Sequence, residues 1–458
     1  MGRRRRASPR ALGLSRPAGG ERVATDIAAP PGLAARQAAH ELVGAVLRRR
    51  QPLDGAFDTS ERVAALAPRD RALARMVAAT TLRRLGQVDA VLARALERPL
   101  PPRAAPALDS LRIGAAQLLF LGSPAHAAVG TAVALLGGRL AVYRGVVNAV
   151  LRRLAREGAA ALSGTSALDN LPAWLRESWI AAHGAEETAA IAEAIAADPP
   201  LDIVVKSGDP AAWAAALDAE LLPTGTLRRR AGGVPAELPG FAEGAWWVQD
   251  AAATLPARLL GDVAGREAID LCAAPGGKTA QLAAAGAIVT AVERSEGRLR
   301  RLRRNLARLG LEANCVAADA IDWRPARPAP LVLLDAPCSA TGTARRNPDM
   351  PHLRMPEDVA RVVPLQARLL DAAADMTAPG GTLVYCVCSL QPEEGEAQVD
   401  AFLARRPGFT RRPVAEAEIG GLGGCITPAG DLRTLPSHLA EAGGLDGFHA
   451  ARLVRALD

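Results

Sequence analysis

Two cysteines in this 458-residue chain stand where a thiol could take part in covalent chemistry. Cys338 lies in the segment Asp-Ala-Pro-Cys-Ser, just after the apolar run Leu331–Asp335, and Cys388 lies near the end of the apolar run Thr382–Ser389. A cysteine thiolate is accessible near neutral pH and is a strong nucleophile. If both runs are strands of an open α/β sheet, the two thiols face one crevice at the edge where such sheets bind ligands. The other cysteines are expected to be inert packing residues: Cys272, Cys315, Cys386 and Cys425.

A glycine turn forms a second candidate site. The segment Asp-Leu-Cys-Ala-Ala-Pro-Gly-Gly-Lys-Thr, residues 270–279, ends a predicted strand and opens a helix, so Gly276 and Gly277 allow the backbone to approach a ligand at a helix N-terminus. It is neither a GxGxxG nor a Walker A sequence, which argues against a dinucleotide or a nucleoside triphosphate. Lys278 is one of only two lysines, with Lys206, in a chain that otherwise uses arginine. We therefore expect Lys278 to serve the bound ligand.

Three acids follow predicted strands of the same sheet. Glu293 closes the strand after the glycine turn, where a carboxylate can accept hydrogen bonds from ribose hydroxyls. Asp319 follows a third strand and Asp335 ends a fourth. Any one of these acids alone is more simply explained as a helix cap or a surface residue. A glycine turn together with acids at successive strand ends predicts a nucleoside-shaped site.

The elements that would position these residues are predicted from about residue 251 to the C-terminus. Short apolar runs alternate with helical patterns there, which is typical of a parallel, doubly wound, Rossmann-like sheet. Leucines at 3, 4, 3 spacing place one face of the helix after the second run on the sheet, with its arginines outward. The predicted strands are Ala268–Cys272, Ile288–Glu293, Leu331–Asp335 and Thr382–Ser389, and the leucines are Leu299, Leu302, Leu306 and Leu309.

The region before the sheet is predicted to form three further parts. Residues 1–30 are rich in Arg, Pro, Gly and Ala and predict a disordered tail. Residues 31–165 show only helical periodicity and predict an all-α domain, whereas 166–250 predict a small α+β connector. In the connector we expect Leu201–Lys206 to be a strand, Ala211–Leu222 a helix, and the pair Trp246–Trp247 to pack against the next domain. The predicted helices of the all-α domain are 34–50, 67–85, 105–121, 126–137 and 142–156.

The net charge of +7 favours a polyanionic partner, but its distribution is uneven. Six arginines and no acid fall within the first 20 residues, which leaves the rest of the chain at only +1. Attraction to nucleic acid would then depend on local clusters, of which the candidates are Arg228–Arg230, Arg300–Arg304 and Arg345–Arg346. For each cluster alone, a solvated helix face is the simpler interpretation.

Other classes of protein are disfavoured by composition. No apolar run reaches the ~18 residues that span a bilayer, and no secretory signal is recognisable, so we expect a cytoplasmic protein without membrane contact. The cysteines and histidines lack the spacing of a zinc site, so we expect neither metal nor disulfides. We expect a monomer.

Taken together, four segments resemble the signature blocks of the Nol/Nop/Sun family of RNA cytosine-C5 methyltransferases. These segments are Asp270–Thr279, Asp335–Gly342, Arg346–Asp349 and Cys388–Glu394. The helical domain, with Asp70–Leu73 and Asn148–Leu154, resembles the RNA-binding NusB-like domain. The resemblance implies a NusB-like domain, a connector and a Rossmann-like methyltransferase domain, and small-subunit 16S ribosomal RNA as the partner.

The resemblance also implies roles for individual residues. Cys388 would attack C6 of cytosine, Cys338 would help to release the product, and Asp335 and Lys278 would complete the catalytic set. S-adenosylmethionine would be the cofactor. Its site would comprise Cys272, Ala273, Ala274, Pro275, Gly276, Gly277, Lys278, Glu293, Asp319 and Asp335.

Two departures from the family pattern leave alternatives open. Val387 stands where the family commonly has Thr, so Cys386 remains a possible substitute for Cys388, and Glu293 stands where the family commonly has Asp. DNA cytosine methyltransferases use a Pro-Cys cysteine as nucleophile, which would be Cys338 here.

The substrate could also be 23S ribosomal RNA or transfer RNA, or the chain could be a non-catalytic NusB-like assembly factor. Methylation of an amino nitrogen is disfavoured, because such enzymes carry Asn/Asp-Pro-Pro-Tyr where this chain has Asp-Ala-Pro-Cys.

Overall fold

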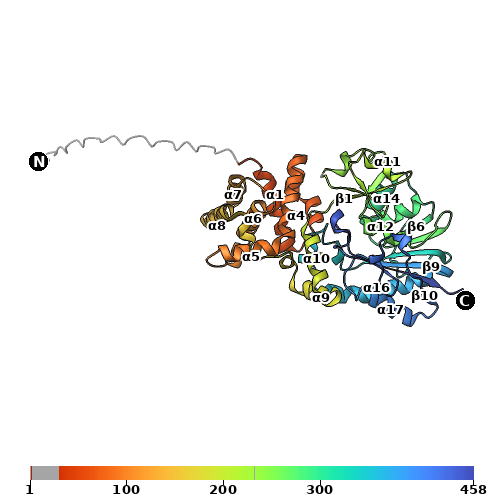
Figure 1. Ribbon diagram of the computed structural model, residues 1–458. Coiled ribbons are helices and arrows are strands. Elements are labelled where there is room, and N and C mark those ends of the chain that lie inside the picture. Colours follow the sequence, from red (N-terminus) through yellow and green to blue (C-terminus); the bar gives the residue numbers. More distant parts are fainter. Residues whose placement is uncertain (1, 3–29, 232, 458) are drawn as a thin grey trace.

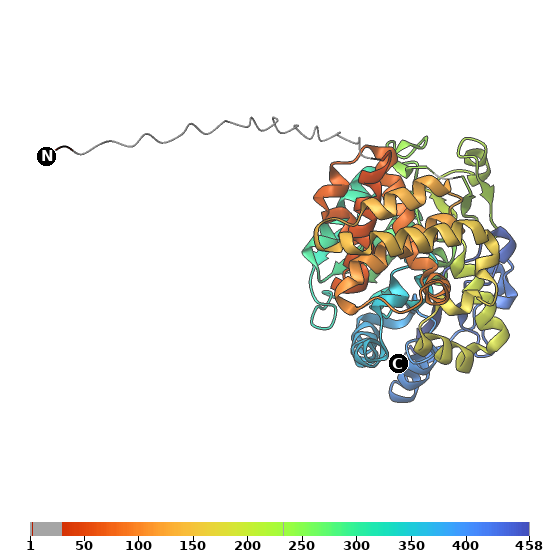
Figure 2. The same cartoon turned by 90° about the vertical axis from the view of Figure 1, so that its left-hand side faces the viewer.

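The computed structural model describes residues 2, 30–231 and 233–457 (Figure 1). A helical part and a part built on β-sheets lie side by side, and the helical part forms the nearest layer when the molecule is turned (Figure 2). The predicted tail over residues 1–30 lies outside the described residues except for Gly2 and Pro30. Within the described ranges, no helix is long and apolar enough to cross a membrane.

The N-terminal part is a helical bundle, as predicted. α1 (Leu33–Arg49) packs against α4 (Pro68–Arg83) and α6 (Ala105–Leu119), and α6 packs in turn against α7 (Ala125–Ala134) and α8 (Arg144–Glu157). Each helix turns an Ala, Leu and Val face inward, which gives two clusters of buried side chains on either side of α6. The remaining helices of the bundle are α2 (Leu53–Thr59), α3 (Glu61–Ala64) and α5 (Leu85–Ala95).

The described residues of the connector form three α-helices and a small antiparallel sheet. The helices are α9 (Ala173–His183), α10 (Ala185–Ala196) and the short α11 (Pro210–Ala214). The sheet has the order β2-β3-β1-β4. Its strands are β1 (Leu201–Val205), β2 (Glu220–Leu221), β3 (Leu227–Arg229) and β4 (Trp246–Val248).

The predicted helix over Ala211–Leu222 is wrong beyond its first turn. α11 spans only Pro210–Ala214, and the chain then turns through Asp218, whose φ of 48° is left-handed. Glu220–Leu221 becomes a strand because its backbone pairs with β3, although both side chains are exposed. Sheet pairing thus overrides the helical propensity of this alanine-rich segment.

The C-terminal part is a twisted sheet with the order β10-β12-β9-β8-β5-β6-β7. The five strands from β9 to β7 are parallel, whereas β12 (Phe448–Arg455) runs antiparallel to β9 and was not foreseen. The parallel strands are β5 (Glu267–Leu271), β6 (Ile288–Glu293), β7 (Asn314–Ala317), β8 (Ala329–Asp335) and β9 (Thr377–Val387). The short strands at the other edge are β10 (Phe409–Arg411) and β11 (Leu432–Thr434). The predicted Rossmann-like architecture is confirmed.

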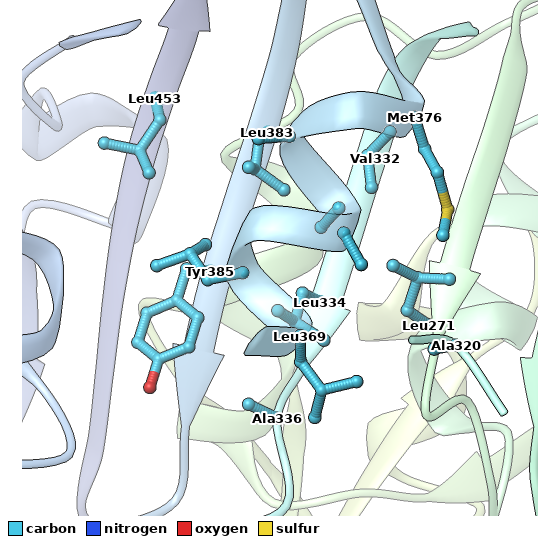
Figure 3. Close-up of a cluster of buried hydrophobic side chains, with 14 of the residues drawn as sticks. Leu271, Ala320, Val332, Leu334, Ala336, Leu369, Met376, Leu383, Tyr385 and Leu453 are labelled. Atoms are coloured by element: carbon cyan, nitrogen blue, oxygen red, sulfur yellow. The ribbon is translucent and has the colours of Figure 1, made fainter. Parts of the chain in front are cut away.

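Helices cover both faces of this sheet. α16 (Pro356–Met376) packs on one face, where its Leu369 and Met376 lie against side chains of β8 and β9 (Figure 3). α12 (Ala251–Arg258) contributes to the core on the other face. The remaining helices that flank the sheet are α13 (Gly277–Ala284), α14 (Glu296–Leu309) and α17 (Glu396–Arg405).

Candidate active site at the carboxyl edge of the sheet

A cavity of about 490 Å³ opens at the carboxyl ends of β5, β8 and β9. Because β8 lies between β5 and β9, the segments that follow these three strands meet at one edge. The cavity walls include Lys278 from the glycine turn, Asp335 from the end of β8 and Cys388 from the end of β9. The structure therefore brings together three of the four predicted catalytic residues in one cavity and places the fourth, Cys338, directly behind them.

The two thiols are neighbours. Cys338 Sγ lies 3.4 Å from Cys388 Sγ, within hydrogen-bond distance for sulfur. Cys388 lines the cavity, whereas Cys338 packs against the core beneath α16. The hydrogen bond to Cys388, together with burial, raises the pKa of Cys338 well above its ordinary value. Cys338 therefore keeps its proton, and Cys388 is the sulfur that is open to a ligand.

A buried carboxylate ties together the two loops that carry these thiols. Glu394 has no solvent-exposed surface, and its Oε2 accepts hydrogen bonds from Ser339 N at 2.8 Å and Gln366 Nε2 at 3.0 Å. Its Oε1 accepts from Ser389 Oγ at 2.8 Å and from Ser339 Oγ. Ser339 and Ser389 directly follow Cys338 and Cys388, so Glu394 fixes both thiols through their neighbours. No role was predicted for Glu394 from the sequence, although Glu394 closes the segment that begins at Cys388.

Lys278 and Asp335 form a buried ion pair. Lys278 Nζ lies 2.8 Å from Asp335 Oδ2 and 5.1 Å from the ring centre of Phe448, and only 7% of Lys278 is exposed. Burial lowers the pKa of Lys278, but the Asp335 carboxylate outweighs this effect and raises it above the ordinary value. Asp335 Oδ1 also accepts a hydrogen bond from Cys386 Sγ at 3.5 Å. Lys278 is thus a fixed cation at the cavity floor rather than a proton acceptor.

Cys386 is fully buried, and its backbone pairs with Asp335 in the sheet. Burial and then the negative charge of Asp335 raise the pKa of Cys386 well above its ordinary value. This thiol is held protonated against the carboxylate.

The glycine turn is shaped by its neighbours. Gly276 has a left-handed φ of 101°, and a Cβ there would lie 2.9 Å from Leu302 Cγ of α14. A Cβ on Gly277 would lie 3.1 Å from the side chain of Gln249 in the connector. The glycines thus let α14 and the connector approach the turn, and α13 begins at Gly277 with N–H groups that lack intrahelical partners. Of the other residues of the turn, Ala273 and Pro275 line the cavity, Ala274 is buried, and burial raises the pKa of Cys272 to about 12.

Glu293 and Asp319 lie at the neighbouring strand ends but do not line the cavity. Glu293 Oε1 accepts a hydrogen bond from Ser295 N at 2.8 Å. Its buried Oε2 lies 3.2 Å from Arg298 Nη1 but accepts no hydrogen bond from any residue that the structure describes. Asp319 Oδ1 accepts from Ile321 N at 3.0 Å. A buried carboxylate oxygen without a donor fits a ligand hydroxyl.

Two of the predicted nucleic-acid clusters are largely structural. Arg228 is fully buried and pairs with Asp202 at 2.7 Å within the connector. Arg345 is 1% exposed and pairs with Asp250 at 2.5 Å. Both side chains also donate to the loop before β12, Arg228 to Gly444 O and Arg345 to Gly443 O, so they join the connector to the α/β part. Only the cluster Arg300–Arg304 remains exposed throughout apart from the buried Leu302.

No group of three or more His, Cys, Asp or Glu side chains that could hold a metal ion occurs among residues 30–231 and 233–457.

Comparisons with known proteins agree on both halves of the chain. A family model described as 16S rRNA methyltransferase RsmB/F matches residues 257–454, and the NusB family model matches residues 33–156. Ribosomal RNA small subunit methyltransferase B of Pseudomonas putida is 37% identical over 92% of this chain and 98% of its own length.

Two solved structures share the fold. One, described as the crystal structure of PH0851, has a TM-score of 0.69 at 22% identity and covers 92% of this chain and 98% of that one. The other is NSun6 from Pyrococcus horikoshii with SFG, which has a TM-score of 0.53 at 20% identity and covers 63% of this chain and 98% of that one.

Proposed function

The chain belongs to the 16S rRNA methyltransferase RsmB/F family, and from this premise we propose that it methylates C5 of a cytosine in small-subunit ribosomal RNA. The observation that carries the proposal is the arrangement of the two thiols. Cys388 lines a cavity that also holds Lys278 and Asp335, and Cys338, 3.4 Å behind it, keeps its proton. One thiol free to attack and one thiol able to exchange a proton are what C5 chemistry requires.

The reaction follows from the weak nucleophilicity of C5. The Cys388 thiolate adds to C6, forming a C–S bond and moving the electron pair of the C5–C6 double bond so that C5 becomes nucleophilic. After C5 has gained a methyl group, a base removes the C5 proton, the double bond re-forms and the C–S electrons return to sulfur. We assign Cys338 a part in this release, because it lies within hydrogen-bond distance of the departing sulfur.

Lys278 and Asp335 support the addition step. Lys278 lines the same cavity as Cys388, so its ammonium, held by Asp335, supplies a fixed positive charge there. Asp335, held by Lys278 at the cavity wall, is placed to hydrogen-bond the polar edge of the base.

The methyl donor that we propose is S-adenosylmethionine. When bound, it supplies an electrophilic methyl group. The residues of the glycine turn from Cys272 to Lys278 would hold its amino-acid part near the N-terminus of α13, and Asp335 would border it. The orphan oxygen of Glu293 fits a ribose hydroxyl, and Asp319 follows on the next strand.

The RNA must present an unstacked cytosine, because C6 is out of reach inside a duplex. The relative from Pseudomonas putida is named for the small ribosomal subunit, which supports 16S ribosomal RNA as the substrate. We propose that residues 31–165 are an RNA-binding domain and that 166–250 connect it to the methyltransferase domain over 251–458.

One labelling experiment tests the proposal. Radiolabelled S-adenosylmethionine is supplied with naked small-subunit RNA, assembled small subunits, large-subunit RNA and transfer RNA, and the labelled nucleoside is identified after digestion. We expect 5-methylcytidine in small-subunit RNA. The proposal would be contradicted if the labelled methyl group were found on an amino nitrogen, if it were found only in another class of RNA, or if no RNA were labelled.

A further inference from the structure

α14 carries an unusual surplus of positive charge. Its four leucines are buried against the glycine turn and the sheet, and the rest of its surface presents six arginines against one acid, Glu296. Ser295 caps its N-terminus by accepting from Arg298 N, and Gly310 ends it with a left-handed φ of 62°, so the helix is well defined at both ends. The arginines are Arg298, Arg300, Arg301, Arg303, Arg304 and Arg308.

These arginines differ in their partners. Arg298 lies beside Glu293, and Arg303 pairs with Glu296 at 3.1 Å. Arg301 and Arg304 are exposed, and neither forms a hydrogen bond or an ion pair within the described part of the chain. Arginines without partners in a folded chain are available to an external anion.

The helix turns one of its sides toward the candidate active site. Arg301, Asn305 and Arg308 line the same cavity as Lys278 and Cys388. Arg301, Arg304 and Arg308 follow one another at 3 and 4 residues, so they form a continuous stripe along one face of the helix. The two ends of this arginine stripe, Arg301 and Arg308, line the cavity, and Arg304 between them is exposed to solvent.

The charges inside the cavity make the stripe distinct. Lys278 is paired with Asp335, and Arg346, another lining residue, lies 2.6 Å from Asp446. By contrast, Arg308 pairs with no carboxylate among the described residues: it donates to Phe241 O at 2.7 Å and Trp246 O at 3.1 Å and lies 3.9 Å from the ring centre of Phe241. The positive charge that no carboxylate offsets therefore lies on the α14 wall.

We propose that the arginine stripe of Arg301, Arg304 and Arg308 binds the phosphates that flank the target cytosine and so leads the RNA strand to the cavity. The inference rests on the proposed RNA substrate. A nucleotide turned into the cavity keeps its phosphates at the mouth, beside this wall, and guanidinium groups bind phosphate oxygens through paired hydrogen bonds. Because the arginine stripe contacts phosphates and not bases, it contributes affinity and positions the RNA strand but gives no sequence specificity.

The test is a double substitution, Arg301→Gln with Arg304→Gln, in the full chain. Glutamine keeps the helix propensity of arginine, so circular dichroism and melting should match the parent. Binding of transcribed small-subunit RNA is measured from low to high salt. With two phosphate contacts removed at about 0.7 each for a single strand, the slope of log K against log salt should fall by about 1.4, with roughly tenfold weaker binding at low salt.

Arg303→Gln is the matched control, because Arg303 lies on the same helix but is already paired with Glu296 and with Cys315 O. Its salt slope should stay at the parent value. An unchanged slope in the double variant, or an equal fall in Arg303→Gln, would overturn the inference.

Binding is measured without turnover, so the two proposals fail in different ways. If the parent forms no 5-methylcytidine but the salt slope of RNA binding still falls in the double variant, the proposed function is wrong and phosphate binding by the arginine stripe is supported. If the parent forms 5-methylcytidine and the double variant binds RNA as the parent does, the stripe is wrong and the function stands.

Discussion

The two halves of the sheet edge are built in different ways. The thiol half lies at the ends of β8 and β9. It is held together by hydrogen bonds, because the buried Glu394 accepts from the residues that follow Cys338 and Cys388. In the acid half, at the ends of β6 and β7, the acids lie beside arginines that are exposed to solvent. Glu293 lies beside Arg298, whose side chain is 56% exposed, and Asp319 lies 3.7 Å from Arg294, whose side chain is 74% exposed.

This difference matches what each half is proposed to do. A group that forms a covalent bond gains rate from being held in the reactive position, because the entropic cost of alignment is met on folding. A site for a donor that must enter and leave on every cycle needs contacts that can open. We infer that the thiol half is preorganised and that the acid half adjusts to its ligand.

The largest effect is expected at Glu394. Glu394→Ala leaves the buried donors of Ser339, Ser389 and Gln366 without their acceptor, which should cost about 3 kcal/mol of unfolding free energy and about 100-fold or more in turnover. Denaturant unfolding and single-turnover methylation measure both quantities. The neighbouring Glu393 is exposed, so Glu393→Ala is the matched control and should resemble the parent. Equal behaviour of the two variants would contradict a preorganised thiol half.

A smaller effect is expected where the two halves meet, at Lys278. Lys278→Arg places a larger, planar cation in a buried space between Asp335 and the ring of Phe448. Weakening one charge-assisted hydrogen bond predicts a fall in kcat/KM of about 10- to 100-fold. The control is Lys206→Arg, because Lys206 does not line the cavity and its Nζ donates to the backbone carbonyl of Leu309 at 2.8 Å. Calorimetry of donor binding and steady-state kinetics identical to the parent would remove Lys278 from the site.

The smallest effect is expected in the acid half. Glu293→Gln keeps the shape of the side chain but removes its charge, so KM for S-adenosylmethionine should rise by about tenfold, with kcat unchanged and no change in RNA binding. Glu296→Gln, three residues on in α14, is the control, since Glu296 is exposed and pairs with Arg303. A fall in kcat with an unchanged KM would mean that Glu293 acts on the reacting atoms rather than on the donor.

Much of the fold could be predicted from periodicity. The helices of the N-terminal part and the four apolar runs of the sheet appear where their patterns indicate, because each buries a continuous apolar face. The pair Trp246–Trp247 is buried as expected, and Trp247 packs against Ala273 and Leu302. The helix over Ala211–Leu222 failed because strand pairing with β3, a contact between separate segments, decided its second half.

The candidate site was predictable in its residue types but not in its supports. Spacing brought Cys338, Cys388, Lys278 and Asp335 to one edge, because each follows a parallel strand. Sequence spacing could not show that the Glu394 side chain lies between the two loops and accepts hydrogen bonds from both. Sequence spacing also could not show that Arg228 pairs with Asp202 and Arg345 with Asp250, since these partners lie 26 and 95 residues away along the chain.

The central claim is the division of labour between the two thiols, and a covalent protein–RNA complex tests it most directly. Cys338→Ala and Cys388→Ala are each incubated with S-adenosylmethionine and labelled small-subunit RNA, and the mixtures are separated by denaturing electrophoresis. Cys386→Ala is the control and should turn over without accumulating a complex, because the Cys386 thiol is buried against Asp335. We expect Cys338→Ala to accumulate a stable complex and Cys388→Ala to form none and to be inactive. A stable complex in Cys388→Ala would make Cys338 the nucleophile and contradict the assignment.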